Sequence, residues 1–248
     1  MTMEITYLNN SGFLVRDGGT LLLFDDYADP AHAVERALEQ AYDRFYILAS
    51  HAHFDHFDTH IRDYAEHVTQ YIFSYDIRST KRVKSFPQNA ITYMAAYSDW
   101  TDGYLHVTAF DSTDVGVSFL VETAEGRRIF HAGDFNWWHW EGDTHENQML
   151  ARNAFRKQMK KLEGMEAELA FFPVDARMGN SWDMGIREFV RCTKLSGFVT
   201  MHNETGIVNG NIWTPPEDFF APGKAIPFWT PKQAGETQMW DFPDFINS

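Results

Sequence analysis

The run His51-Ala52-His53-Phe54-Asp55-His56 constrains this chain more than any other feature of its sequence. It places three imidazoles and one carboxylate within six residues, directly after an apolar stretch at residues 45–50. On a helix, His53 would lie about 200° around the axis from His51, so one helix face could not present the whole set. The run therefore predicts a loop at the carboxyl end of a buried strand, and a metal site on that loop.

The ligand types narrow the choice of metal. Imidazole and carboxylate without thiolate suit zinc, manganese or iron. We expect one or two divalent metal ions as cofactors, with zinc as the first candidate and manganese or iron as the alternatives.

Size and charge exclude several classes of protein. A chain of 248 residues with 44% hydrophobic residues can bury a large core, and we expect a single domain over residues 1–248, with a tail from about residue 215 that wraps the domain. The formal net charge of -14 argues against a nucleic-acid partner, because backbone phosphates are held by clustered Lys and Arg. Cys192 is the only cysteine, so an intramolecular disulfide is excluded. With no signal-like amino terminus and no apolar run of about 18 residues, we expect a cytoplasmic protein without a membrane partner.

Strand and helix patterns alternate in both halves of the chain. Strands are predicted at residues 5–8, 12–16, 20–25, 45–50, 70–74, 105–110, 116–122, 128–131, 169–173 and 197–201, and helices at 31–42, 59–67, 146–163 and 184–194. This alternation predicts a layered α/β domain with two sheets and helices outside them.

A single loop cannot complete a metal site, so distant parts of the chain must supply further ligands. Two places qualify. Asp134 follows the apolar strand at 128–131 in the string His131-Ala132-Gly133-Asp134, where Gly133 permits a tight turn. His202 ends the apolar stretch at 199–201.

These ordered motifs resemble those of the metallo-β-lactamase-fold hydrolases. The His51-x-His53-x-Asp55-His56 spacing, the opening Ser11-Gly12-Phe13 and the His131-Ala132-Gly133-Asp134 form are most similar to the branch that includes the ascorbate-phosphate lactonase type. The resemblance spans roughly residues 4–205. It implies a four-layer αββα sandwich with a two-ion site at the edge of the sheets.

The resemblance also implies a role for each ligand. His51 and His53 would hold the first ion, and Asp134 would bridge the two ions. The second ion would be held by Asp55, His56 and His202. Members of this superfamily usually supply another His to the first ion, before the hairpin that leads to Asp134. This chain has Asp111 and Asp114 in that region instead. Either aspartate would have to substitute, and without it the second ion would be bound more tightly than the first.

Three further residue assignments stay open at this level. His131 either orients Asp134 or a ligand through hydrogen bonds or has a purely structural role. Arg177 is a candidate for binding an anionic substrate, with a structural ion pair to a neighbouring carboxylate as the alternative. The aromatic run at residues 137–140 either lines the pocket or packs in the core.

The predicted function is metal-assisted hydrolysis of a small molecule. A bound metal lowers the pKa of water toward about 7 and polarises the bond under attack. Asp55 and Asp134 are the candidate catalytic residues, because a carboxylate there would orient the water and relay its proton. The substrate would be a lactone, an ester or a phosphorylated sugar acid. A phosphodiesterase acting on small molecules, or a metal-binding sensor without turnover, remains the alternative, and the oligomeric state is left open.

Overall fold

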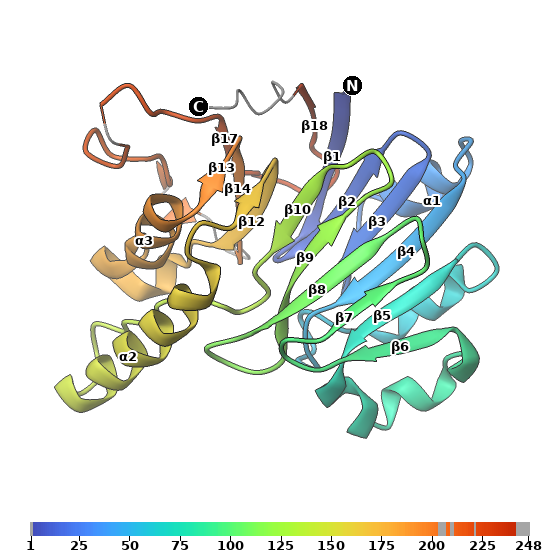
Figure 1. Cartoon of the computed structure of the whole chain (residues 1–248), viewed down its shortest axis with the longest axis horizontal. Helices are drawn as coiled ribbons and strands as arrows, with labels where there is room; N and C mark the ends of the chain where they lie inside the picture. Colours follow the sequence, from blue (N-terminus) through green and yellow to red (C-terminus); the bar gives the residue numbers. More distant parts are fainter. Residues whose placement is uncertain (1, 203–206, 209–210, 221, 242–248) are drawn as a thin grey trace.

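The computed structural model describes residues 2–202, 207–208, 211–220 and 222–241 of the chain (Figure 1). The strands of the first half are β1 (Thr2–Asn9), β2 (Gly12–Asp17), β3 (Thr20–Phe24), β4 (Arg44–Ala49), β5 (Gln70–Ser74), β6 (Ile91–Met94), β7 (Asp99–Thr101), β8 (His106–Asp111) and β9 (Val117–Glu122). Those of the second half are β10 (Arg128–His131), β11 (Glu166–Ala167), β12 (Leu169–Pro173), β13 (Lys194–Leu195), β14 (Phe198–Met201), β15 (Ile207–Val208), β16 (Asn211–Ile212), β17 (Phe228–Trp229) and β18 (Thr237–Asp241).

The helices are fewer and mostly short. The α-helices are α1 (Ala33–Leu38), α2 (His145–Leu162) and α3 (Met184–Cys192). The 3-10 helices are η1 (Thr59–Tyr64), η2 (Tyr75–Ser79), η3 (Arg82–Ser85), η4 (Gln88–Ala90) and η5 (Ala176–Ser181).

Two large sheets form the centre of the molecule. Within the described residues each has seven strands, in the orders β18-β1-β2-β3-β4-β5-β6 and β17-β14-β12-β10-β9-β8-β7. Helix α1 and the 3-10 helices η1 to η4 cover the outer face of the first sheet, and α2 and α3 cover that of the second (Figure 1). This is the four-layer αββα arrangement that the resemblance implied.

Alternating side chains show why the sheets are buried on both faces. In β3, Leu22 and Phe24 face the second sheet, whereas Leu21 and Leu23 face the helices. In the second sheet, Phe171 packs against the first sheet, while its neighbour Phe172 packs under α3. Successive side chains of a strand point to opposite faces, so strands covered on both faces read as continuous apolar runs.

The direction of the strands places the polar strand ends together. Strands β3, β4, β5 and β6 are mutually parallel, as are β10, β12, β14 and β17. Parallel strands end at the same edge of a sheet, so residues that directly follow β3, β4, β10, β12 and β14 can meet there.

Most predicted elements are present, with differences in the short helices. The helix predicted at 31–42 is limited to α1 (Ala33–Leu38). At its end the Arg16 guanidinium donates hydrogen bonds to the carbonyl oxygens of Ala37 and Ala41. The helix predicted at 59–67 is the 3-10 helix η1, whose first turn is capped by Asp58. The sequence patterns do not predict β6, β7, β11, β13 or the tail strands β15 to β18.

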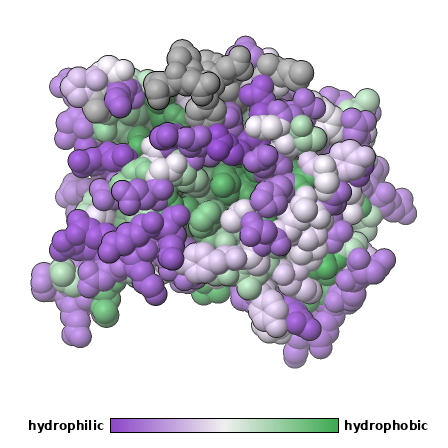
Figure 2. Space-filling view, viewed as in Figure 1, coloured by the Kyte–Doolittle hydropathy of each residue, from purple (hydrophilic) through white to green (hydrophobic). Residues whose placement is uncertain are grey.

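The tail contributes an edge strand to each sheet. β17 pairs parallel with β14, and β18 pairs antiparallel with β1. Polar side chains cover the outer rim of the face seen in Figure 1, including α2, and apolar side chains show mainly near its middle (Figure 2). In the described part of the chain, no helix has the length and apolar character needed to span a bilayer.

Candidate metal centre

The histidine loop leaves β4 at the edge where the strand ends meet. The loop is non-helical, which agrees with the prediction, and side chains from other segments hydrogen-bond to its backbone. The amide of Ala52 donates to Asp76 at 2.9 Å, and the Arg82 guanidinium donates to the carbonyl oxygens of Ala52 and Phe57. These contacts fix the loop, so its imidazoles are presented in a defined arrangement.

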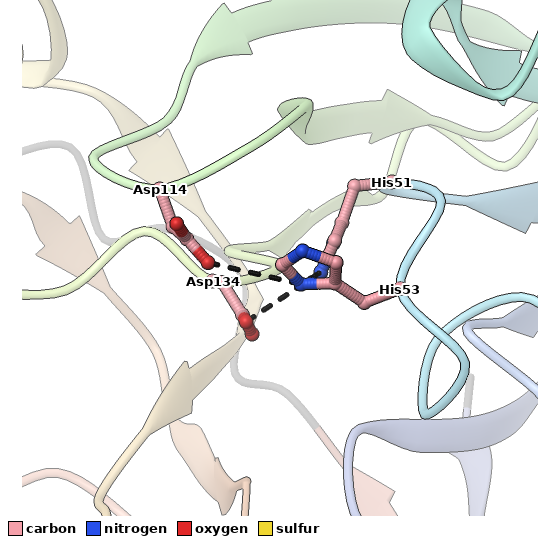
Figure 3. A group of neighbouring side chains, drawn as sticks. All are labelled: His51, His53, Asp114 and Asp134. Atoms are coloured by element: carbon pink, nitrogen blue, oxygen red, sulfur yellow. Dashed lines mark hydrogen bonds and ion pairs between the residues drawn. The ribbon is translucent and has the colours of Figure 1, made fainter. Parts of the chain in front are cut away.

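A first group of four potential ligands gathers at this loop (Figure 3). His51, His53, Asp114 and Asp134 offer ligand atoms that all lie within 4.8 Å of one another. His51 Nε2 is 3.0 Å from His53 Nδ1 and 3.5 Å from Asp134 Oδ2, and His53 Nδ1 is 3.8 Å from Asp114 Oδ2.

Asp114, and not Asp111, occupies the place left open by the missing histidine. Asp111 ends β8 and accepts a hydrogen bond from Gln158 of α2 at 2.7 Å. Asp114 lies in the β8–β9 turn, which approaches the histidine strand through Gly116 at φ 77°. A Cβ on Gly116 would lie 2.1 Å from the carbonyl oxygen of Ser50, so only glycine allows this close approach.

A second group lies directly beside the first. Asp55, His56 and His202 also offer ligand atoms within 4.8 Å of one another. Asp134 faces this group as well, because its Oδ1 is 3.1 Å from His56 Nε2 and 3.4 Å from His202 Nε2. The two oxygens of Asp134 therefore face different groups, which is the arrangement of a bridging carboxylate.

The residues fit a pair of divalent ions. Two ligands about 2.1 Å from one tetrahedral ion lie roughly 3.4 Å apart, close to the separations seen here. His56 Nε2 and Asp134 Oδ1 are buried and lie 3.1 Å apart, yet neither makes a well-oriented hydrogen bond among the described residues. Buried polar atoms rarely lack a partner, and both of these atoms face the centre. The donors are imidazoles and carboxylates without thiolate, which suits zinc, manganese or iron.

Two buried carboxylates orient the histidines of the second group. His56 Nδ1 lies 2.7 Å from Asp25 Oδ2, and His202 Nδ1 lies 3.0 Å from Asp175 Oδ2. Each carboxylate accepts the Nδ1 proton and leaves Nε2 directed into the centre, as in the carboxylate–histidine pairs of metal sites.

Asp25 also orients His51, through Ser50. The Ser50 hydroxyl donates to Asp25 Oδ2 at 2.6 Å and lies 3.0 Å from His51 Nδ1. A hydroxyl has one proton, so Ser50 must accept the Nδ1 proton of His51, which leaves His51 Nε2 as a lone pair. The Ser50 amide donates to Asp25 Oδ1 at 2.6 Å. One carboxylate thus orients an imidazole of each group.

The electrostatics of the centre favour cations. Burial lowers the pKa of His51 to about 3, and His56 beside it acts in the same direction, so His51 is a neutral imidazole. Burial also opposes a charge on His202, but the neighbouring carboxylates of Asp134 and Asp175 outweigh it and raise its pKa to about 9. Burial would raise the pKa of Asp134, yet His56 and His202 hold it well below 3.8. An anionic Asp134 that draws positive charge onto its neighbours would also attract a metal ion.

His131 is hydrogen-bonded to backbone on both sides. Its Nδ1 accepts from the Gly133 amide at 3.2 Å, its Nε2 lies 2.9 Å from the carbonyl oxygen of Ser11, and its ring stacks on Phe24. Burial lowers the pKa of His131, so the ring is neutral. His131 therefore shapes the turn that presents Asp134 and lies outside both ligand groups.

A cavity of about 470 Å³ opens beside the two groups. Arg177 lines it and pairs with Asp175, its Nε lying 3.0 Å from both carboxylate oxygens. The ion pair foreseen as the alternative for Arg177 is thus present, but its side chain is 62% exposed and borders the cavity. The aromatic run is divided, because Trp137 stacks on Phe155 of α2 while Trp138 and Trp140 line the cavity.

Sequence reasoning missed Asp25, Ser50 and Asp175. Asp25 and Asp175 each follow closely on a buried strand that pairs with a ligand-bearing strand. That shared position at a parallel strand end was the signal available in the sequence.

Comparisons with known proteins agree with this architecture. No family model and no curated protein matches the sequence. Among solved structures, the metallo hydrolase Igni18 from Ignicoccus hospitalis KIN4/I matches with a TM-score of 0.64 and 17% identity, over 98% of this chain and 100% of that one. The metallo-beta-lactamase fold protein YhfI from Bacillus subtilis matches with a TM-score of 0.53 and 12% identity, over 96% and 99%. CmlA, a diiron beta-hydroxylase from Streptomyces venezuelae, matches with a TM-score of 0.53 and 12% identity, over 83% of this chain and 45% of that one.

These likenesses show the fold. The chain has two large sheets in a mixed α/β architecture, and this architecture is the metallo-β-lactamase fold.

Proposed function

We propose that the protein is a metal-dependent hydrolase that acts on a small molecule with two divalent ions. The observation that carries this proposal is the pair of ligand groups on either side of Asp134, which border an open cavity. The first ion would be held by His51, His53, Asp114 and Asp134. Asp55, His56 and His202 would hold the second ion, with Asp134 shared.

Asp114 changes the expectation for relative affinity. With Asp114 in place, each ion would have two imidazoles, one carboxylate of its own and the shared Asp134. The first group therefore does not lack a ligand relative to the second, and we expect two ions bound with comparable affinity.

The chemistry divides between the ions and the protein. When bound, the ions would lower the pKa of water and polarise the bond under attack. Asp55 and Asp134 are the proposed catalytic carboxylates. Asp55 Oδ2 accepts a hydrogen bond from Asn10 at 3.2 Å, which fixes the carboxylate at the cavity wall, where it can orient water and accept its proton. No protein nucleophile is required.

For the substrate and the metal we propose classes of compound and of ion. The motif resemblance supports a lactone, an ester or a phosphorylated sugar acid, with Arg177 binding its anionic group. Igni18 is named a metallo hydrolase, which supports hydrolysis on this fold, and CmlA is named a diiron enzyme, which keeps iron beside zinc and manganese as a candidate.

Metal titration combined with a hydrolysis screen tests the proposal. Metal-free protein titrated with Zn²⁺, Mn²⁺ or Fe²⁺ should bind two ions per chain, and the loaded protein should hydrolyse a member of a lactone, ester and phosphodiester panel. Asp134→Ala should lose both ions and all hydrolysis. A protein that binds two ions but cleaves nothing in the panel would be better described as a metal-binding sensor, and selective cleavage of phosphodiesters would favour the phosphodiesterase.

A further inference from the structure

The cavity beside the metal centre has a wall of two tryptophans to which the proposed function gives no role. Trp138 and Trp140 form this wall, with the Trp138 ring 5.4 Å from the ring of His202, and Arg177 lies next to it. The volume of the cavity, about 470 Å³, lies within the usual range for small-molecule sites. The inference below rests on the proposed function, because it takes this cavity as the substrate pocket.

Arg177 is held ready to bind an anion. Its Nε and Nη2 both donate hydrogen bonds to the Asp175 carboxylate, and Nη2 lies 3.4 Å from His202 Nδ1. Within the described residues, Nη1 makes no hydrogen bond. A guanidinium fixed on one edge loses little side-chain entropy when its other edge binds a carboxylate.

The two tryptophans stack in parallel next to this guanidinium. Their rings are parallel to within 6°, with centroids 5.8 Å apart. The indole nitrogen of Trp138 donates to the carbonyl oxygen of Asp134 at 2.9 Å, which fixes its ring. The guanidinium carbon of Arg177 lies 5.8 Å from the centroid of Trp140. A planar ligand ring can pack on such a pair in the offset or edge-to-face geometry that aromatic rings prefer, and gains energy beyond the area it buries.

The loop that carries the tryptophans is attached to the segment that carries Arg177. The Glu141 carboxylate accepts the amide of Asn180 in η5 at 2.8 Å. Gly179 at φ 64° brings the two segments close, because a Cβ there would meet the same carboxylate. The aromatic surface and the guanidinium are thus held in one arrangement.

The charges around the cavity limit the anion that it accepts. Four carboxylates line it, Asp55, Asp114, Asp134 and Asp143, against the single guanidinium of Arg177. Two divalent ions would offset these four carboxylates, and Asp175 already offsets part of the guanidinium charge. With so little positive charge in excess, a ligand with one negative charge is favoured over a phosphate, whose nearly two charges at neutral pH would be repelled by the surrounding carboxylates.

We propose that this cavity binds small planar-ring compounds that carry one carboxylate, with the carboxylate on Arg177 and the ring against Trp138 and Trp140. The substrate class is then a carboxylated aryl ester or ring-fused lactone, with its acyl group directed toward the metal centre.

Three matched amides test the ligand class without turnover. They are para-acetamidobenzoate, neutral acetanilide and para-acetamidophenyl phosphate, titrated calorimetrically into the metal-loaded full chain at about pH 7.5, where the phosphate carries nearly two charges. The benzoate should bind at least about tenfold more tightly than either of the others, as expected for one charge-assisted pair.

Variants locate the effect. Arg177→Met should weaken binding of the benzoate by about 10- to 100-fold and leave acetanilide unchanged. Trp140→Leu should weaken all three compounds by about 3- to 10-fold. Arg187→Met is the matched control, because Arg187 also pairs with a carboxylate, Asp183, and lies over an aromatic ring, Phe219, outside this cavity. It should change nothing. Metal content is measured for every variant.

Several outcomes would overturn the proposal. It fails if acetanilide or the phosphate binds the unmodified protein as tightly as the benzoate, or if metal-loaded Arg177→Met keeps the preference. If Arg177→Met loses its ions, the three titrations on the unmodified protein decide.

Ester hydrolysis separates this proposal from the hydrolase assignment. Equal kcat/KM on phenyl acetate and para-carboxyphenyl acetate would reject the ligand class and keep the hydrolase. The expected binding pattern with no cleavage of any ester, lactone or phosphodiester would reject the hydrolase and keep the ligand class.

Discussion

Replacing Asp25 with asparagine should weaken both metal sites, although Asp25 belongs to neither ligand group. Its carboxylate accepts three hydrogen bonds, from the Ser50 amide at 2.6 Å, the Ser50 hydroxyl at 2.6 Å and His56 Nδ1 at 2.7 Å. An asparagine has one acceptor oxygen, so its amide group must point at one of these donors. Either the contact with the Ser50 amide is lost, or His56 Nδ1 and the Ser50 hydroxyl that orients His51 lose their acceptor.

The size of the effect follows from these contacts. Loss of a partner that orients a ligand typically costs about 10- to 100-fold in metal affinity. His56 contacts Asp25 directly, so the second ion should lose close to 100-fold. His51 is reached through Ser50, so the first ion should lose closer to 10-fold. The free energy of unfolding should fall by about 2–4 kcal/mol, because a buried charged network is broken.

Two matched variants separate the sites. Ser50→Ala removes only the link to His51 and should weaken the first ion alone. Asp175→Asn acts on His202 and should weaken the second ion alone. Competition titrations of metal-free protein against a chelator measure both affinities, and urea unfolding measures stability. If Asp25→Asn bound both ions as the unmodified protein does, or if Ser50→Ala weakened both equally, the proposed hydrogen-bond chain would be wrong.

Three further predictions concern residues around the centre. Asp114→Asn should reduce the bound metal from two ions to one in a stoichiometric titration, whereas Asp111→Asn, which removes a carboxylate bonded to α2, should leave two. Gly116→Ala should lower the free energy of unfolding by more than about 3 kcal/mol and disturb the first ion, because its Cβ would collide with backbone, whereas Gly126→Ala, at a similar φ with open space around it, should cost only about 1–2 kcal/mol in the same urea titration. Burial opposes a charge on His60, but its two aspartate partners outweigh it and raise its pKa to about 9, from 6.5 in an unfolded chain. The contribution of His60 to the free energy of unfolding is therefore complete below pH 6.5 and is lost as the pH rises through 9. His60→Gln should lower the free energy of unfolding by about 1–2 kcal/mol below pH 6.5 and by little above pH 9. Equal losses at both pH values would contradict this.

The parts of the fold and site predictable from sequence are those written in local patterns. Apolar runs that end in polar residues located β4, β10 and β14, and with them the histidine loop, Asp134 and His202. Because these strands are buried on both faces, their composition is distinctive even without knowledge of their neighbours. The roles of these residues as ligands remain part of the proposed function.

The parts that could not be predicted depend on which strands are neighbours. Asp25 meets His56 because β3 pairs parallel with β4, and Asp175 meets His202 because β12 pairs parallel with β14. Strand order is not visible in local periodicity. The choice between Asp111 and Asp114 likewise depended on contacts with α2 and on the close approach of Gly116, neither of which a single sequence reveals.

The position of the centre between the sheets connects metal binding to the fold. His51, His53, Asp55 and His56 follow a strand of the first sheet, whereas Asp114, Asp134 and His202 follow strands of the second. Each proposed ion would therefore be bound from both sheets at once. An ion bound only by the folded chain stabilises it by about 2.7 kcal/mol at a concentration one hundred times its dissociation constant. The same ions would offset the repulsion among the carboxylates that the two sheets bring together. The carboxylate cluster, which is unfavourable by itself, would then help to hold the two sheets together.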